Sequence, residues 1–463
     1  PAPELALLGY SLRRMSKARW SPLRGLPEQG QLWSWISFDV ANQSFTLLIN
    51  TLLFPLFFTQ VVAQGSDRGS TMWSLVYASS MLLTVAASPI AGAIADERSW
   101  KKEALVVTGL ACAVLTCLLA LIEPGQLWLA ALLYIPANFM FSIGENFLAS
   151  FLPELTRREE FGRVSGFSWA CAYAAALVLL ALTAGAMLAF GLERAETWRP
   201  FFVFAGVWFV VFAIPTMLVL REKQRPRTHT GRNVWIVGFQ RLGESLRKTR
   251  EFRDLAMLLA ASVLYGAGMS VIIFFASILA AEFGFRDTQL VIFVAVITVS
   301  GVVGTLGPTF LQDRLGHRRT TIVLLVLWLV TALLFALFAF LRSRSPDPAN
   351  FPTWPMWVLG NVIGFGLGSL GSANRAFVGY LTPRSRTAEV FGVWGMVFKL
   401  AAVLTIPFAY VKDTLGVTSS LLLLAGFILG GLLVTLLVDE KRGADAARAA
   451  DEASGVVPTT PSA

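Results

Sequence analysis

Four ionisable side chains lie inside long apolar stretches of the sequence: Asp39, Glu145, Arg375 and Lys399. A charge in membrane hydrocarbon is costly, so such a residue is expected to bind an ion or solute or to relay a proton. We expect Asp39 or Glu145 to take up and release a proton. A carboxylate and a guanidinium together complement the two charges of an amino acid or small peptide, and Arg375 is the expected anchor for the anionic group.

Polar side chains accompany these charges at helical spacing. One apolar stretch carries a polar residue at each helical turn, and a second stretch repeats the pattern up to Glu145. Such a stripe on an apolar helix is expected to line an aqueous cavity. The two stripes consist of Asp39, Gln43, Thr46 and Asn50, and of Asn138, Ser142 and Glu145. The residues expected on the solute or proton pathway are Asp39, Asn42, Gln43, Asn50, Asn138, Glu145, Asn374, Arg375 and Lys399.

Two alternatives for these charges remain open. Long basic side chains near a helix end can extend to the lipid headgroups, which applies to Lys399 and Arg375 more than to the short carboxylates. Glu145 and Arg375 could also form an ion pair, and a pair that forms in only one state could bias a conformational change.

The elements that position these residues are apolar segments of membrane-spanning length. Hydrophobic residues make up 55% of the 463 residues and charged residues 14%, with a mean hydropathy of +0.64. A soluble protein carries about a quarter charged residues, and a spanning helix needs about 20 apolar ones. Twelve spans are expected, near 34–61, 70–95, 102–122, 126–151, 161–190, 199–220, 254–283, 288–312, 320–341, 355–380, 388–411 and 416–438.

The distribution of positive charge predicts the orientation of the chain. Most of the 38 lysines and arginines fall on one side if the N-terminus is cytoplasmic, as the positive-inside rule requires. The net charge of +9 is scattered over all these turns, so no nucleic-acid partner is expected. The first 20 residues are polar and basic without an apolar core, so we expect no cleaved signal peptide.

The longest polar break, 221–253, divides the chain into two similar sets of six spans. "PELTRREEFG" after the fourth span aligns with "PRSRTAEVFG" after the tenth, and this register places Glu145 opposite Arg375 and Lys399 opposite Trp169. Two repeated halves with a site between them are typical of a secondary transporter. We therefore expect a segment at 1–33, bundles at 34–220 and 254–438, a basic linker at 221–253 with an amphipathic helix, and a disordered tail at 439–463.

Two short loops carry an aspartate followed by basic residues, "GAIADERSWKK" and "LQDRLGHRRT". They resemble the signature loop of the major facilitator superfamily, although Ser99 stands where that family has glycine. The resemblance implies that Asp96 docks against the start of the eleventh span. It also implies that the first and fourth helices of each half line the pathway, which leaves Lys399 beside it. The gating residues implied are Gly92, Asp96, Arg98, Lys101, Lys102, Asp313, Arg314, Gly316, Arg318 and Arg319.

Three further stretches resemble the vacuole effluxer-like branch of that superfamily. They are 34–58, with an Asp-x-Ala-Asn core, 146–176, with Asn146 followed by Leu-Pro-Glu and Gly-Arg-x-Ser-Gly, and 373–404, with Asn-Arg, Glu-x-Phe-Gly and a lysine. Fungal members of this branch export amino acids from the vacuole, so the resemblance implies export.

Other chemistries lack support in the sequence. Cys112, Cys117 and Cys171 show no CxxC spacing, and only two histidines are present, so no metal site is expected. No phosphate-binding GxxxxGK[ST] loop, HExxH motif or Ser-His-Asp set indicates ATP coupling or an enzyme, and no cofactor is expected.

The sequence thus predicts an all-α membrane protein of twelve helices in two pseudo-symmetric six-helix bundles. We expect a monomeric, proton-coupled transporter of a small polar solute, such as an amino acid or small peptide, in a bacterial inner membrane with both termini cytoplasmic. Its expected partners are lipid, the solute and protons. An exporter of drugs or lipophilic cations, and a receptor or lipid-interacting protein that transports nothing, remain alternatives.

Overall fold

The computed structural model describes residues 28–98, 100–156, 161–222, 252–285, 288–348, 351–383 and 386–453, and all regular structure in these residues is helical. The first half contains α2 (Gln29–Gln43), η1 (Ser44–Leu53), α3 (Phe54–Phe57), η2 (Phe58–Val62), α4 (Gly69–Arg98), α5 (Lys101–Leu118), η3 (Leu119–Leu121), α6 (Leu127–Leu155), α7 (Phe161–Phe190), η5 (Ala195–Thr197) and α8 (Arg199–Val219). The second contains α10 (Arg253–Glu282), α11 (Thr288–Leu315), α12 (His317–Arg344), α13 (Trp354–Tyr380), α14 (Thr387–Ala401), η7 (Ala402–Leu404), α15 (Thr405–Leu437) and α16 (Glu440–Ala453).

The membrane crossings agree with the predicted spans. Among the described residues, 11 helical stretches are long and apolar enough to cross a membrane, and the last of them, Val390–Leu437, is 48 residues long. This stretch turns back at Gly416, whose φ of 85° and ψ of 173° are non-helical. Glycine adopts such a φ readily because it has no Cβ. Dividing the stretch there gives the twelve crossings predicted.

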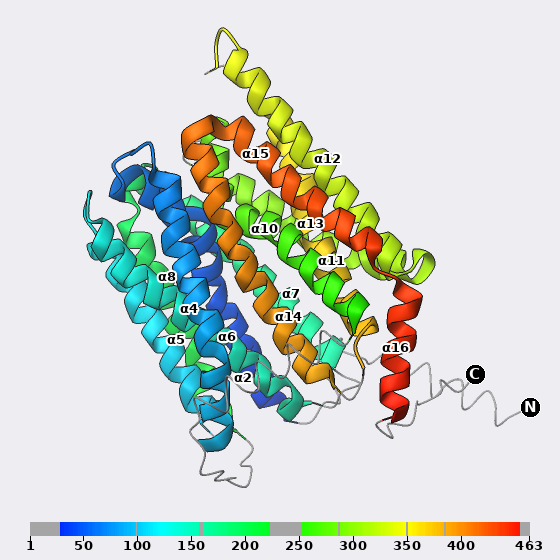
Figure 1. Cartoon of the computed structure of the whole chain (residues 1–463). Coiled ribbons are helices and arrows are strands. Elements are labelled where there is room, and N and C mark those ends of the chain that lie inside the picture. The colour runs from blue at the N-terminus through cyan, green and yellow to red at the C-terminus, as the bar shows by residue number, and fades with distance from the viewer. Residues whose placement is uncertain are drawn as a thin grey trace, which may run out of the picture.

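The helices pack mainly within two halves of the chain (Figure 1). In the first half α2 packs on α7 and α8, and α5 on α6 and α8. In the second, α10 packs on α15, and α13 packs on α11 and α12. The halves meet where α4 contacts α14 and α15 and where α7 contacts α11. Most of the predicted linker, with its amphipathic helix, lies outside the described residues.

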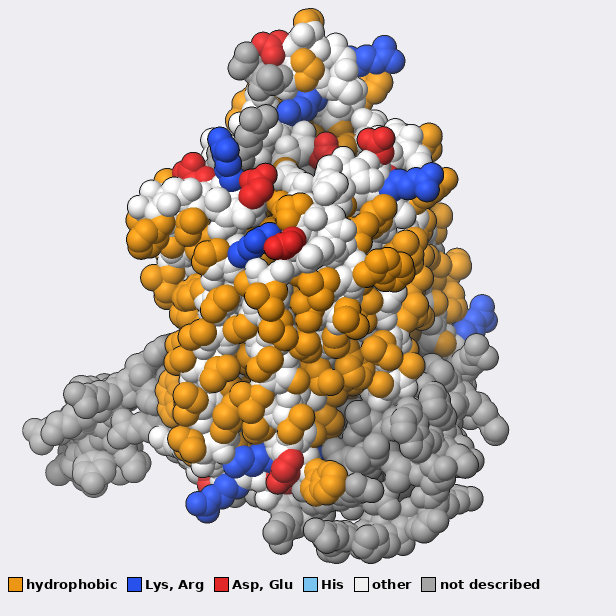
Figure 2. Space-filling view, turned by 90° about the vertical axis from the view of Figure 1, so that its left-hand side faces the viewer, with side chains coloured by type: hydrophobic (Ala, Val, Ile, Leu, Met, Phe, Trp, Pro, Cys, Tyr) orange, Lys and Arg blue, Asp and Glu red, His pale blue; other side chains and the backbone are white. Residues whose placement is uncertain are grey.

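The surface is that of a membrane protein. Figure 2 shows a broad band of hydrophobic side chains, with charged side chains gathered towards its two ends. We call the end at which α16 lies, at the bottom of Figure 1, the α16 face, and the other end the opposite face. Long apolar helices expose no unpaired backbone group to lipid, because every internal N–H and C=O group is hydrogen-bonded within the helix.

The first crossing is not a regular α-helix. Ser44–Leu53 and Phe58–Val62 form π-helix, in which each N–H bonds five residues back, and the Thr51 hydroxyl likewise donates to the Thr46 carbonyl at 2.9 Å. A π-helix takes more residues per turn than 3.6, so side chains beyond Gln43 drift round the axis relative to the predicted stripe. The drift explains why Asn50 leaves the face that carries Asp39.

The tail differs from its prediction. Residues 440–453 form helix α16, so the expectation of disorder is wrong for this part of the segment. Its sequence is rich in alanine, a strong helix former. The helix is also anchored, because Arg442 donates two hydrogen bonds to the Asp254 carboxylate at the start of α10, at 2.8 and 2.7 Å.

Candidate functional site

Three of the four predicted membrane charges lie at similar depth. Counted from helix ends at the α16 face, Asp39 and Glu145 are each about 15 Å into α2 and α6, and Lys399 is about 18 Å into α14. Arg375 is only about 8 Å from the end of α13. Since the hydrocarbon is about 30 Å thick, the first three approach its middle.

Lys399 bridges the two halves at this depth. Its Nζ donates to Oδ1 of Asn146 on α6 at 3.0 Å, and Nδ2 of Asn146 donates to Oγ of Ser88 on α4, also at 3.0 Å. The Ser88 hydroxyl in turn donates to the Thr84 carbonyl at 2.6 Å. This chain fixes the Asn146 amide with its oxygen towards the cation. The resemblance implied a place beside the pathway for Lys399, and this contact puts its side chain between the two halves.

Glu145 faces charges from two sides. Its carboxylate interacts electrostatically with Lys399 on α14 and with Asp39 on α2. Glu145 and Asn146 are both exposed, although they lie deep in a spanning helix. Exposure at this depth, next to a cation of the other half, indicates a water-accessible surface between the halves.

Asp39 is held on the first half. Its carboxylate accepts a hydrogen bond from the hydroxyl of Ser168, a buried residue of α7. The neighbouring Asn42 is buried, and its Nδ2 has no hydrogen-bond partner in the described part of the chain. A buried amide N–H group needs an acceptor, from the protein, from water or from a bound solute. Gln43 is half-buried one residue further on.

Arg375 does not join this group through an ion pair with Glu145. Within the described residues, the ion pairs given by the structure connect other side chains. Arg375 is exposed on α13. The cation that the structure places near Glu145 is Lys399, and the sequence register could not reveal this because it aligns Lys399 with Trp169.

Asn50 and Asn138 belong to a closed network instead of an open surface. Asn50 donates to Oδ1 of Asn138 at 3.1 Å and accepts from the Tyr134 hydroxyl at 2.8 Å, and Asn138 donates to the Ser80 hydroxyl at 2.6 Å. All four side chains are buried. In the second half, Asn374 is likewise buried and donates to the Ser262 hydroxyl at 3.1 Å. These asparagines hold helices together.

The gating residues are only partly described. The structure does not describe Ser99 or the side-chain environment at five further positions: Gly92, Asp96, Arg98, Asp313 and Arg314. Lys101 is buried, with its Nζ 3.0 Å from Oε1 of Glu154, so this ion pair ties α5 to α6 within the first half. Gly316 precedes α12 with a φ of 83°, and Arg319 is exposed.

Two glutamates accept hydrogen bonds from helix N-termini at this face. Glu440 accepts from the N–H groups of His317 and Arg318 at the start of α12, at 3.1 and 2.9 Å. Glu222 accepts from the N–H of Lys102 at the start of α5, at 3.1 Å. A carboxylate is favourable there because the helix N-terminus carries partial positive charge.

The surroundings of Glu222 disfavour the ionised form of its carboxyl group. Burial raises the pKa of its carboxyl, the Lys102 N–H lowers it, and the charges of Glu103 and Glu154 raise it further. Arg318 strengthens the cap at α12, because its Nη2 donates to the Leu436 carbonyl at 2.6 Å.

At the opposite face the two halves are joined directly. Oδ2 of Asp413 accepts from the N–H and the hydroxyl of Thr71 at the start of α4, at 2.6 and 2.7 Å. Nε1 of Trp73 donates to the Phe274 carbonyl at 3.0 Å, and the rings of Tyr77 and Phe274 stack with centroids 3.6 Å apart. These contacts close the halves together on this side.

The comparisons with known proteins agree with this architecture. The model of the "Vacuole effluxer Atg22 like" family matches residues 68–448. The chain belongs to this family. The predicted vacuole effluxer-like branch is therefore confirmed.

Two relatives, one bacterial and one fungal, are similar to this Atg22-like chain. The uncharacterized MFS-type transporter YxiO of Bacillus subtilis is 25% identical over 385 residues, which cover 80% of this chain and 85% of YxiO. Autophagy-related protein 22 of Coccidioides immitis is 26% identical over 274 residues, covering 54% of this chain and 44% of the fungal protein. The match thus spans less than half of that protein's length.

Solved structures confirm the major facilitator fold for this Atg22-like chain. A point mutant of the nucleoside transporter NupG superposes with a TM-score of 0.67 at 14% identity, over 89% of this chain and 98% of that one. The inward open xylose transporter XylE from E. coli gives 0.62 at 12% identity, over 88% and 94%. Identities this low show the fold alone. Taken with the family, the chain is an integral membrane transporter of the major facilitator type.

Some residues near the site escaped the sequence analysis. Ser168 orients Asp39 but stands alone as an ordinary polar residue in the sequence, whereas Asn146, which orients Lys399, is the asparagine of the family-like stretch 146–176. Trp169, the counterpart of Lys399 in the sequence repeat, is exposed on α7. No group of three or more metal-binding side chains occurs in the described part of the Atg22-like chain.

Proposed function

We propose that this transporter moves a small solute carrying both charges, such as an amino acid or small peptide, in exchange for protons. The observation that carries the proposal is the bridge from Lys399 to Asn146 beside Glu145. It brings a cation of one half to the carboxylates of the other at a single depth. A zwitterion would replace Asn146 as the partner of Lys399, with its carboxylate bound to Lys399 and its ammonium group to Glu145.

The carboxylates are proposed to carry the protons. Glu145 takes up a proton when the solute leaves, because its carboxylate then loses the ammonium counter-charge that stabilised the ionised form. Asn42 offers the solute a buried N–H donor. Arg375, nearer the α16 face, would attract the anionic group on its way rather than hold it. Asn50, Asn138 and Asn374 are assigned to packing and not to the solute.

Alternating access follows from the contacts between the halves. Rocking would separate Asp413 from Thr71 at the opposite face and close the water-accessible surface around Glu145. We propose that the α16 face is cytoplasmic in a bacterial inner membrane, as the charge distribution predicts, and that the chain works as a monomer. Efflux is supported by the name of the family. A lysine at the centre of the site opposes a lipophilic cation as solute.

Counterflow into vesicles containing the purified protein tests this proposal. Radiolabelled amino acids and dipeptides, together with a lipophilic cation, would be exchanged at equal pH and then driven by a pH gradient. We expect Lys399→Met to abolish both the exchange and the accumulation driven by the gradient. Glu145→Gln should keep exchange at higher solute concentrations, because the amide oxygen still accepts from the ammonium group, and should lose accumulation driven by the gradient. Arg375→Met should retain most of the exchange. Lys441→Met, an exposed lysine of α16, is the matched control and should behave as the parent.

Two outcomes would reject the proposal. Transport of the lipophilic cation by the parent protein and by Lys399→Met, with amino acids and peptides inert in both, would favour a drug exporter. Absence of exchange across the whole panel, with correctly folded protein, would favour a receptor or lipid-interacting role.

A further inference from the structure

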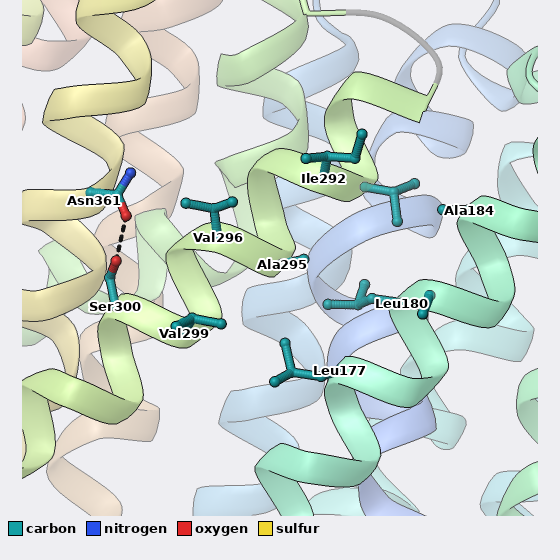
Figure 3. A pocket seen from close by; sticks show the side chains of 11 residues that line it. Leu177, Leu180, Ala184, Ile292, Ala295, Val296, Val299, Ser300 and Asn361 are labelled. Carbon is teal, nitrogen blue, oxygen red and sulfur yellow. Dashed lines mark hydrogen bonds between the residues drawn. The ribbon is translucent and has the colours of Figure 1, made fainter.

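A crevice lies between α7 of the first half and α11 of the second (Figure 3). Its volume is about 340 Å³. Leu177, Leu180 and Ala184 line one wall, and Ile292 and Val299 line the other. Along α7, these residues begin about halfway from the α16 face and continue towards the opposite face. The crevice is therefore separate from the charged site, which lies nearer the α16 face.

The crevice offers almost nothing to a polar ligand. Its polar lining side chains are Ser300 and Asn361, and Figure 3 shows them bonded to each other. The Ser300 hydroxyl donates to Oδ1 of Asn361, and Nδ2 of Asn361 donates to the Trp357 carbonyl at 2.7 Å. Since these groups satisfy one another, a polar solute entering the crevice would lose its water without replacement.

The crevice continues the lipid-facing surface. Ile292 and Val299 form part of its wall and are also exposed, and Val178 and Leu182 are exposed on the neighbouring turns of α7. All of them belong to helices long and apolar enough to cross a membrane. The medium that reaches the crevice is therefore the hydrocarbon of the bilayer.

We propose that a hydrocarbon chain of a bilayer phospholipid occupies this crevice. An apolar cavity of about 150 Å³ takes up a benzene molecule, so the crevice holds about twice that volume of hydrocarbon. The chain replaces dispersion contacts that an empty crevice would lack. The headgroup remains at the opposite face, where α7 ends and α11 begins.

Because the crevice lies between the two halves, the bound hydrocarbon chain of the lipid can influence the conformation of the protein. A rocking motion changes the separation of α7 and α11, so the hydrocarbon chain binds to one conformation better than to the other. A ligand with such differential affinity shifts the equilibrium between them. Bilayer composition would then bias the transport cycle without contact with the solute.

Photolabelling in lipid nanodiscs tests the proposal directly. A phosphatidylcholine with a photoreactive diazirine in one acyl chain would be activated, and the labelled peptides mapped by mass spectrometry. We expect labelling of residues 177–184 and 291–299 above that of the exposed face of α8. The double variant Ala184→Phe/Ala295→Phe fills the crevice and should lose this labelling. Val207→Phe, which adds the same ring to the lipid-facing surface of α8, should keep it.

Three results would overturn the proposal. Labelling of the crevice peptides no stronger than on α8 would mean that no chain resides there. Unchanged labelling in the filled variant would place the lipid elsewhere. A protein dimer in the nanodiscs that the filled variant no longer forms would identify the crevice as an interface between copies. Should the double variant fail to fold, the single variant Ala295→Phe serves the same comparison.

Discussion

At the α16 face the first half places Glu222 at the start of α5, and the second half places Glu440 at the start of α12. Each glutamate follows the last crossing of its own half, in "REK" and "DEK" respectively. The middle of the membrane is different. There the first half supplies Asp39 and Glu145, while the second supplies Lys399.

This comparison separates scaffold from chemistry. A helix N-terminus needs an acceptor in either half, because its first N–H groups have no partner within the helix. The repeated glutamates meet this need twice. The zwitterionic solute proposed above would need two different surfaces, which an asymmetric pair of halves supplies. Where the halves depart from their repeat, we therefore place the transport chemistry.

The strongest test of the asymmetry is a double-mutant cycle on the charges. Glu145→Gln and Lys399→Met should couple by about 2 kcal/mol in the free energy of unfolding, because each removes the charge that the other faces. Glu145→Gln and Arg375→Met should couple by less than about 0.5 kcal/mol. Unfolding in mixed micelles with increasing denaturing detergent measures both cycles. A larger coupling to Arg375 would restore the pairing suggested by the sequence repeat.

A second test compares the asparagine networks of the two halves. Asn138→Ala should cost about 1.5 kcal/mol, because it removes the partner of Asn50 and a donor to Ser80. Asn374→Ala should cost about 0.5 kcal/mol, because Ser262 keeps its bond to the Leu258 carbonyl. The same unfolding assay decides between them. Equal costs would show that the network in the first half is no stronger than its counterpart.

The smallest expected difference concerns the two caps. Glu440→Gln should lower the free energy of unfolding by about 1 kcal/mol, because the carboxylate accepts from two N–H groups. Glu222→Gln should lower it by about 0.3 kcal/mol, because burial and nearby acids already oppose its charge. Glu452→Gln, an exposed position on α16, is the control and should change nothing. A reversed order would mean that the tail contributes little to α12.

Much of the fold could be predicted because it depends on local sequence. The membrane spans are predicted from the length of the apolar segments. The expected orientation is predicted from the basic residues in the loops. The prediction of a disordered tail was wrong for residues 440–453, because composition alone does not reveal that Asp254 lies where Arg442 can reach it. The stripe through Asn50 failed for a local reason, because the π-helix of Ser44–Leu53 changes the angle between successive side chains.

The sequence singles out three charges of the candidate site but not the contacts that they make, and their role in transport stays a prediction. Asp39, Glu145 and Lys399 stood out because a charge in an apolar helix is expensive wherever the helix lies. Their partners, Ser168 and Asn146, are far away along the chain and carry no charge to mark them. The sequence repeat suggested Arg375 for Glu145, since it compares positions within halves and contains no information about contacts between them.

The sequence by itself determined that this chain crosses the membrane repeatedly, that its two halves are related, and that a few charges lie within it. Length, hydropathy and spacing fix these properties because they act residue by residue. Only the tertiary structure decided that Lys399 reaches Asn146 and that Glu440 caps α12. Those contacts depend on helix rotation and on how the halves meet, and both arise from packing between segments distant in sequence.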